Sequence, residues 1–195
     1  MLGHKVIPVV VLESIDEVET KIGALRSGGI KIAEITFRTE CAAQAIRSAV
    51  NIFPDMCVGA GTVVNAAQCK EALDAGAKFI VGPGLSEGVA RVCAGSNVPY
   101  LPGCVTPTEI IRAMELGLNT VKFFPAGVYG GLSAIKSLAA AFPSVRFVPT
   151  GGIDNSNLLE YLQCPYISAV GGSWMMTGNI KSKSKSAIAI VESIV

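Results

Sequence analysis

The sequence is poor in histidine: His4 is the only one among its 195 residues. Metal-dependent aldolases and epimerases need several histidine or carboxylate ligands in one pocket. Ser-His-Asp and Cys-His catalytic sites need a histidine beside the nucleophile. We expect His4 to be a terminal surface residue. The sequence therefore argues against both kinds of enzyme and against a metal site.

Charge is also scarce. Charged residues make up 16% of the chain, against a usual share of about 25%, and the net charge is +1. There is no basic patch and no acidic tail, so neither nucleic acid nor a membrane surface is an expected partner. Hydrophobic residues make up 50%, yet no apolar run reaches the roughly 18 residues that span a bilayer. We expect many short core segments, with self-association covering part of the apolar excess.

Signal-peptide and disulfide patterns are missing as well. The run VIPVVVL near the start is too short for a signal peptide and has neither a basic flank nor a cleavage site. No cysteine belongs to a Cys-x-x-Cys motif, which predicts reduced thiols in a cytoplasmic protein rather than a disulfide framework or a zinc site. The six cysteines are Cys41, Cys57, Cys69, Cys93, Cys104 and Cys164.

A strand-like segment followed by a helix-like segment recurs along the whole chain. The strand candidates are rich in Val, Ile and Phe, as strands covered on both faces of a parallel sheet are. They span residues 6–12, 32–37, 56–60, 78–81, 99–102, 120–124, 146–149 and 167–170. Amphipathic segments lie between them, and several end at glycines suited to a left-handed C-cap. These glycines are Gly28, Gly29, Gly76, Gly95 and Gly117.

Eight such units indicate a (β/α)8 TIM barrel, an α/β fold, as one domain over residues 1–195. The alternative is an open doubly wound sheet, which would need a glycine-rich phosphate or dinucleotide loop after its first strand. The segment VLESID in that place has no glycine, so the barrel is favoured.

Polar residues and glycines follow seven of the eight predicted strands, at the barrel end where active sites lie. In the strand 32–37, alternation places Glu34, Thr36 and Arg38 on one face. Because the apolar face must meet the helices, we expect these three side chains to point into the barrel mouth. The alternative is a structural Glu34–Arg38 ion pair at the rim.

Lys122 lies in the apolar run TVKFFP, on the same predicted face as Phe124. Each interior layer of a barrel draws on alternate strands, so the second and sixth strands can bring Glu34 and Lys122 to one space. The pair could be a salt bridge only. The other interpretation is a nucleophilic lysine, because desolvation favours the neutral amine that attacks a carbonyl. In that case we expect Glu34 to be the acid and base, one water away from the amine.

Two Gly-Gly pairs follow the seventh and eighth predicted strands, in PTGGID and VGGSW. Glycines there expose backbone N–H groups, and many barrels bind phosphate at these two positions. Tight turns alone would explain one pair better than both. The sequence therefore predicts a phosphate site at this part of the mouth.

In order, the motifs EITFRT, GAGTV, VGPG, PGCVTPTE, VKFFPA, PTGGI and VGGSW resemble those of the 2-keto-3-deoxy-6-phosphogluconate / 4-hydroxy-2-oxoglutarate aldolases, from residue 7 to residue 175. The resemblance implies a class I aldolase, with no metal or cofactor, that cleaves a 2-keto-4-hydroxy acid to pyruvate and an aldehyde. Lys122 would form the Schiff base and Glu34 would be the general acid and base. The implied substrate-binding residues are Arg38, Thr62 and Thr150 for the pyruvate part, Pro83, Phe124 and Gly171 along the pocket, and Gly151, Gly152, Gly172 and Ser173 for the phosphate. Family members are commonly homotrimers.

Several alternatives stay open. The substrate is the phosphogluconate derivative, its galactonate epimer or 4-hydroxy-2-oxoglutarate. A phosphate-binding isomerase or epimerase would use Glu34 as base and Lys122 only for electrostatics, and a sugar-phosphate sensor would use neither. Two departures from the family accompany these alternatives. The helix that precedes the first strand in many relatives is expected to be short or missing, and Gly127 stands where relatives often have Glu.

Overall fold

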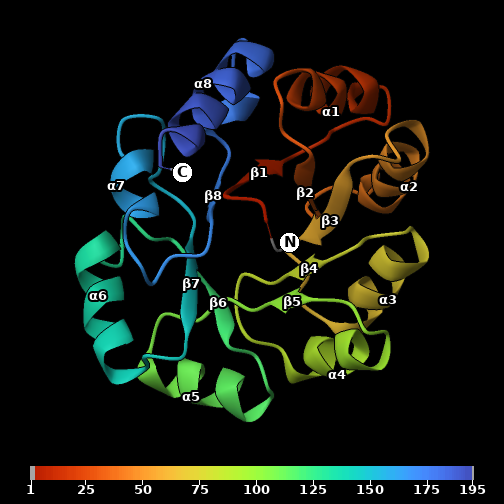
Figure 1. Ribbon diagram of the computed structural model, residues 1–195. Helices are drawn as coiled ribbons and strands as arrows, with labels where there is room; N and C mark the ends of the chain where they lie inside the picture. The colour runs from red at the N-terminus through yellow and green to blue at the C-terminus, as the bar shows by residue number, and fades with distance from the viewer. Residues whose placement is uncertain (1–2, 195) are drawn as a thin grey trace.

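The computed structural model describes residues 3–194, in which eight strands alternate with eight α-helices. The strands lie at the centre and the helices form an outer ring (Figure 1), so the chain has the predicted (β/α)8 fold. The strands are β1 (Val6–Val10), β2 (Ile32–Thr36), β3 (Cys57–Gly61), β4 (Ile80–Val81), β5 (Tyr100–Leu101), β6 (Thr120–Phe123), β7 (Arg146–Pro149) and β8 (Val170–Gly172). The helices are α1 (Glu17–Ser27), α2 (Ala42–Ile52), α3 (Ala66–Asp74), α4 (Glu87–Gly95), α5 (Pro107–Glu115), α6 (Gly131–Ala141), α7 (Leu158–Leu162) and α8 (Ile180–Glu192), with a 3-10 helix η1 (Trp174–Met176) before α8.

Strand pairing divides the ring into two sheets that meet at two seams. One sheet has the order β5-β4-β3-β2-β1-β8, and the other pairs β6 with β7. A bridge between Gly103 and Lys122 closes the first seam, where the Lys122 N–H donates to the Pro102 carbonyl at 2.8 Å. A bridge between Thr150 and Gly171 closes the second seam. The backbone of Lys122 is therefore part of the closure of the barrel.

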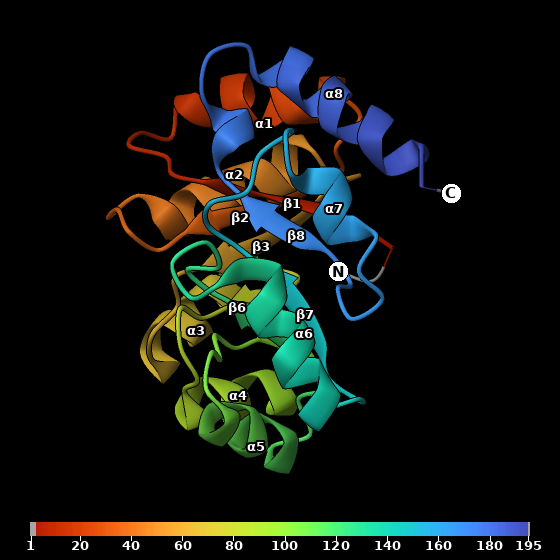
Figure 2. The ribbon, with the colours of Figure 1, turned by 90° about the vertical axis from the view of Figure 1, so that its left-hand side faces the viewer.

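The strands carry continuous apolar runs because both of their faces are covered. All residues of β1 and β2 are buried. The side view shows α1 and α8 along one side of the strands and α4 and α5 along the opposite side (Figure 2). Between β6 and β7 the rings of Phe123 and Phe147 meet edge to face, with 6.4 Å between their centroids. This burial on both sides is the physical reason for the low fraction of charged residues.

The last strand differs from the prediction. β8 covers Val170–Gly172 instead of 167–170, because Gly171 and Gly172 pair in register with Ile7 and Pro8 of β1. The two glycines expected to follow the strand therefore lie inside it and are buried.

The helix ends agree with the prediction in part. Left-handed glycines follow α1, α3 and α5 at Gly29, Gly76 and Gly117, with φ of 92°, 96° and 76°. Gly28, by contrast, has φ −89°. Gly95 is the last residue of α4 rather than its cap, and the left-handed residue there is Asn97, with φ 53°. Asn tolerates this conformation better than other residues with a side chain.

The N-terminal end of the barrel is open. In the described part of the chain no helix precedes β1, and a cavity of about 600 Å³ enters the barrel there. His4 lines this cavity and is half-buried, and its burial lowers its pKa. It is therefore less exposed than expected and lies at the end opposite to the mouth. Across residues 3–194, none of the helices is long and apolar enough to span a bilayer.

A capping box at the start of α5 fixes the loop after β5. The Thr106 hydroxyl accepts from the Glu109 N–H at 3.3 Å, and Glu109 Oε2 accepts from the N–H groups of Val105 and Thr106, each at 2.9 Å. Burial alone would raise the pKa of Glu109, but these hydrogen bonds to its carboxylate outweigh burial and lower it. The capping box thus fixes the loop that follows Gly103, the residue whose bridge to Lys122 closes the first seam.

The lowered pKa of Glu109 predicts a pH-dependent contribution to stability. Glu109→Gln keeps the shape of the side chain but removes its charge, so we expect a loss of about 1 kcal/mol in unfolding free energy at pH 7. Because the native pKa lies below the ordinary value of 4.5, the contribution is complete above that pH and is lost as the pH falls through the native value. Urea unfolding over a pH series measures the gap between variant and parent. A gap that stays constant to low pH would contradict this assignment, and Glu71→Gln, an exposed position on α3, is the control.

Candidate active site

Lys122 and Glu34 meet inside the barrel mouth. β6 supplies the lysine and β2 supplies the glutamate, and their exposed fractions are 5% and 2%. The distance from Lys122 Nζ to Glu34 Oε1 is 3.3 Å. The two side chains therefore share one space, as alternation predicted. The expectation of an intervening water is wrong, because 3.3 Å leaves no room for one.

The amine of Lys122 lies in apolar surroundings. Its Nζ lies 5.2 Å from the centroid of the Phe124 ring. Val121 and Phe123, its neighbours in β6, are fully buried in the core. The lysine backbone is held on one side by Pro102 and on the other by β7, where Lys122 pairs in register with Val148. The amine is thus placed by a rigid strand and shielded from bulk water.

Glycines near the mouth make room for functional side chains. A Cβ at Gly61 would overlap Glu34 Oε1 and lie 2.6 Å from the Glu34 carboxyl carbon. A Cβ at Gly171 would overlap the hydroxyl of Thr150. These close approaches are a second reason for glycine at strand ends, besides the ligand access expected from the sequence.

Arg38 lies at the rim, two residues beyond the end of β2. Its Nε donates to Thr62 Oγ1 at 3.2 Å, and the arginine is exposed. Thr62 has φ 58°, a conformation that is strained for a β-branched residue and that collects at functional sites. Among residues 3–194 the ion-pair partner of Glu34 is Lys122, not Arg38, so the structural Glu34–Arg38 pair is not formed. Pro83 is exposed in the loop after β4.

The loop after β7 is shaped by two consecutive left-handed glycines. Gly151 has φ 90° and Gly152 has φ 78°. The Gly151 carbonyl accepts from the Gly127 N–H at 3.0 Å, which ties this loop to the one after β6. Within residues 3–194 the backbone N–H groups of Gly152 and Ser173 have no protein acceptor. Exposed donors of this kind can bind an anion.

A contact that the sequence did not predict joins the last two loops. The indole N–H of Trp174 donates to Asn155 Oδ1 at 2.9 Å, and a Cβ at Gly172 would overlap the Trp174 ring. One signal in the sequence could have predicted this contact. Trp174 is the only tryptophan of the chain and comes directly after the VGGS segment. A second feature that the sequence left without a role is Thr36, which is fully buried on β2.

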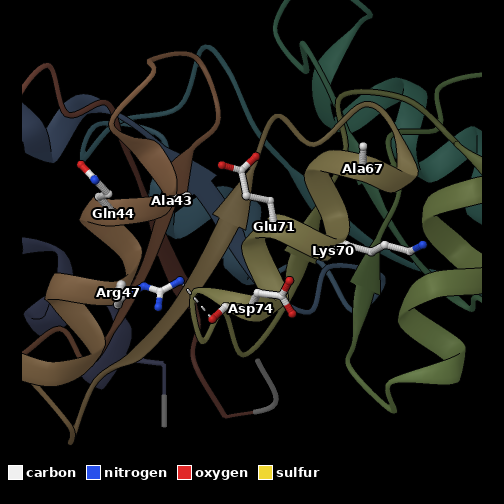
Figure 3. A pocket seen from close by; sticks show the side chains of 7 residues that line it. All are labelled: Ala43, Gln44, Arg47, Ala67, Lys70, Glu71 and Asp74. Carbon is white, nitrogen blue, oxygen red and sulfur yellow. Dashed lines mark hydrogen bonds between the residues drawn. The ribbon is translucent and has the colours of Figure 1, made fainter.

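A surface groove away from the mouth has charged groups but no buried ones. A surface groove of about 690 Å³ lies between α2 and α3, where Arg47, Lys70, Glu71 and Asp74 mix both charge signs (Figure 3). Its polar groups are exposed, and the drawn hydrogen bond runs from the Arg47 guanidinium to the Asp74 carbonyl at 3.4 Å. Across the described residues no cluster of three or more His, Cys, Asp or Glu is placed to hold a metal ion. The mouth differs from this groove because its amine and carboxylate are buried and in contact.

Comparison with known proteins agrees with the geometry of the mouth. The family model described as "KDPG and KHG aldolase" matches residues 1–191. The 2-dehydro-3-deoxy-phosphogluconate aldolase of Treponema pallidum is 46% identical over 172 residues, which cover 88% of this chain and 82% of that protein. The crystal structure of the Zymomonas mobilis 2-keto-3-deoxy-6-phosphogluconate aldolase with 3-phosphoglycerate has a TM-score of 0.91 and 39% identity, covering 96% of this chain and 92% of that one. The Legionella pneumophila KDPG aldolase, with pyruvate captured as a covalent carbinolamine, has a TM-score of 0.88 and 34% identity, covering 98% and 94%. This chain belongs to the KDPG and KHG aldolase family.

Proposed function

We propose that the chain is a class I aldolase, a carbon–carbon lyase, that cleaves 2-keto-3-deoxy-6-phosphogluconate to pyruvate and glyceraldehyde 3-phosphate through a Schiff base on Lys122. The observation that carries the proposal is a buried amine that touches a single carboxylate inside an apolar barrel mouth. The carbinolamine of the Legionella relative is the kind of intermediate that such an amine forms with pyruvate. The galactonate epimer and 4-hydroxy-2-oxoglutarate are the alternative substrates.

The reaction begins at the lysine. The neutral amine of Lys122 attacks the C2 ketone, and loss of water gives a cationic imine. Glu34 is in direct contact with the amine, so it can take the proton that the lysine gives up and return it to the hydroxyl that leaves as water, which restores the carboxylate. When the C3–C4 bond breaks, its electron pair enters the imine and forms an enamine. The imine cation is therefore the electron sink that makes cleavage possible.

Glu34 moves the remaining protons. It takes the proton of the C4 hydroxyl as the aldehyde forms, and later returns a proton to C3 of the enamine. Water then hydrolyses the imine, which releases pyruvate and restores the amine. One carboxylate can serve every step because the amine and the reacting carbons lie in the same space.

The pyruvate part is held by polar groups around Lys122. Arg38 offers its guanidinium to the substrate carboxylate as a two-pronged donor, and Thr62 orients the guanidinium through the 3.2 Å contact. Thr150 adds a hydroxyl. Phe124, Pro83 and Gly171 line the pocket.

The phosphate part is held by the loops after β7 and β8. Gly152 and Ser173 supply N–H groups without a protein acceptor among residues 3–194, and Ser173 also supplies its hydroxyl. Gly151 has no side chain to obstruct the phosphate, and Gly172 leaves room for the Trp174 ring beside these donors. The contact between Trp174 and Asn155 holds the two loops together, which fixes the spacing of the donors.

We further propose a homotrimer in the cytoplasm. Apolar side chains are exposed, among them Val128 at 79% and Tyr129 at 52%, and an interface between copies would cover such surface. All six cysteines are free. Burial raises the pKa of Cys104 to about 12, so this thiol stays protonated and unreactive, as suits a reducing compartment.

The Schiff base makes a direct prediction. Borohydride added with pyruvate should label the parent protein irreversibly at Lys122, and peptide mass mapping identifies the position. Lys122→Ala should fold, lose the label and lose cleavage by about 10³-fold or more. Lys136→Ala, an exposed position on α6, should behave as the parent. A label on any other lysine of the parent would disprove the assignment.

The phosphate site predicts a difference between substrates. Ser173→Ala removes a donor to a charged group, so KM for the phosphorylated substrate should rise about tenfold. Turnover of 4-hydroxy-2-oxoglutarate, which has no phosphate, should change less than about twofold, because no donor to it is lost. Steady-state kinetics with both substrates give the comparison, and Ser133→Ala on α6 is the control. Equal losses on both substrates would place the phosphate elsewhere.

The trimer predicts a molecular mass. Light scattering on the purified protein should give three times the chain mass of 20.2 kDa at micromolar concentration. The mass should stay the same when the protein is diluted further. A mass of one chain throughout would contradict the proposal.

A further inference from the structure

The loop after β7 is held in two different ways along its length. A backbone hydrogen bond from the Gly127 N–H to the Gly151 carbonyl, at 3.0 Å, ties its first part to the loop after β6. The next carbonyl, that of Gly152, has no backbone donor within residues 3–194. It accepts instead from the side-chain amide of Asn157, whose Nδ2 lies 3.0 Å away. The position of Gly152 therefore depends on a side chain five residues further along the chain.

The side chain of Asn157 closes the loop with both ends of its amide. Its Oδ1 accepts from the Asp154 N–H at 3.0 Å, while its Nδ2 donates to the Gly152 carbonyl. An asparagine amide carries one acceptor and one donor group, so it matches a backbone N–H and a backbone carbonyl at once. The Asp154 carboxylate is engaged elsewhere, because its Oδ1 accepts from the Ser156 N–H at 2.8 Å. Asn157 is therefore the side chain that spans the loop from 152 to 154.

The side chain of Asn157 does not cap its own helix. Asn157 comes directly before α7, where an asparagine side chain ordinarily accepts from an N–H group of the first helical turn. No such hydrogen bond is formed at α7. By contrast, Asn65 and Asn179, in the same place before α3 and α8, each make one at 2.9 Å. Helix capping therefore does not account for the asparagine at 157, and both of its hydrogen bonds go to the glycine loop.

The part of the loop that Asn157 holds carries an exposed backbone donor. The N–H of Gly152 has no protein acceptor among residues 3–194. Because a trans peptide is planar, this N–H points away from the Gly151 carbonyl of the same peptide, which faces Gly127. Gly151 and Gly152 have φ of 90° and 78°, and glycine has more backbone freedom than any other residue. The N–H keeps one direction only if the backbone is held on both sides, and Gly127 and Asn157 supply these two contacts.

We propose that Asn157 is a positioning residue for the phosphate part of the substrate. It fixes the backbone at Gly152 so that the N–H of Gly152 faces the phosphate. The proposal rests on the aldolase function proposed above. Asn157 acts through Gly152 and does not touch the substrate, and no bond is made or broken at either residue. Its effect therefore lies in binding of the phosphorylated substrate rather than in the steps at Lys122.

Two substitutions at Asn157 separate positioning of the loop from general stability. Asn157→Ala removes both hydrogen bonds. Asn157→Asp keeps the acceptor for the Asp154 N–H but replaces the donor to Gly152 with a carboxylate oxygen. Asn65→Ala is the matched control, because it removes an asparagine before another helix and leaves the loop after β7 unchanged.

Two measurements on each protein distinguish the phosphate site from the lysine site. Steady-state kinetics give kcat and KM for cleavage of 2-keto-3-deoxy-6-phosphogluconate. Solvent deuterium exchange of the methyl protons of pyruvate, which has no phosphate, reports on the lysine site alone. Thermal unfolding is followed beside them.

We expect both variants at Asn157 to raise KM for the phosphorylated substrate about tenfold, because a hydrogen bond to a charged group is weakened. The kcat should stay within about threefold of the parent, and the rate of pyruvate exchange and its half-saturating concentration within about twofold, because the groups at Lys122 are untouched. Asn65→Ala should lower the unfolding temperature through loss of its helix cap and leave this KM within about twofold.

A parent-like KM in Asn157→Ala or Asn157→Asp would overturn the proposal. So would an equal loss in pyruvate exchange, which would mean that the loop supports the mouth as a whole. Failure of the proposed function has other signatures. Absence of pyruvate exchange in the parent would disprove the aldolase, and a parent-like KM in Ser173→Ala would disprove the phosphate site on which Asn157 acts.

Discussion

The contact between Lys122 and Glu34 is the interaction on which the mouth depends. Burying two charged groups costs desolvation energy that their attraction offsets only when the geometry is well fixed. Here the geometry is fixed by strands: the lysine lies on β6, the glutamate lies on β2, and 3.3 Å separates their atoms. Removal of either partner would leave the other in an apolar interior. The same arrangement that makes the pair costly keeps the amine and the carboxylate together.

Several neighbouring residues hold Lys122 and Glu34 in their positions. Gly61 leaves the space that the Glu34 carboxylate fills. The Phe124 ring covers the amine at 5.2 Å, and the Gly103 bridge locks the lysine backbone at a seam of the ring. The polar groups that face outward, such as Arg38 and Ser173, are exposed at the rim. The charged pair thus lies in the buried interior of the mouth, and the polar groups at the rim are accessible to solvent.

The sequence predicted those parts of the molecule that depend on local pattern. Eight repeated units indicated the barrel, and the period of two placed Glu34 and Lys122 on inward faces. Contacts between residues far apart in the sequence could not be predicted from local pattern. β8 extends through Gly171 and Gly172 because these residues pair in register with β1. The sequence alone predicted a turn there, because a Gly-Gly pair is typical of turns.

Other parts depend on distances that no local pattern encodes. The distance of 3.3 Å between Lys122 Nζ and Glu34 Oε1 leaves no room for the water expected between them, and alternation along each strand does not set that distance. The left-handed residue after α4 is Asn97 rather than Gly95, since either residue type can adopt that conformation. The Thr36 hydroxyl makes no hydrogen bond within residues 3–194, and this depends on where every neighbouring donor and acceptor lies.

The division of the ring into two sheets has a consequence for how such a protein can arise or be rebuilt. Glu34 belongs to the six-stranded sheet and Lys122 to the two-stranded one, and 88 positions separate them along the chain. Neither sheet alone contains both the carboxylate and the amine of the buried pair. A fragment built on one sheet alone would therefore carry the amine or the carboxylate but not both, so the buried pair can form only in the complete ring.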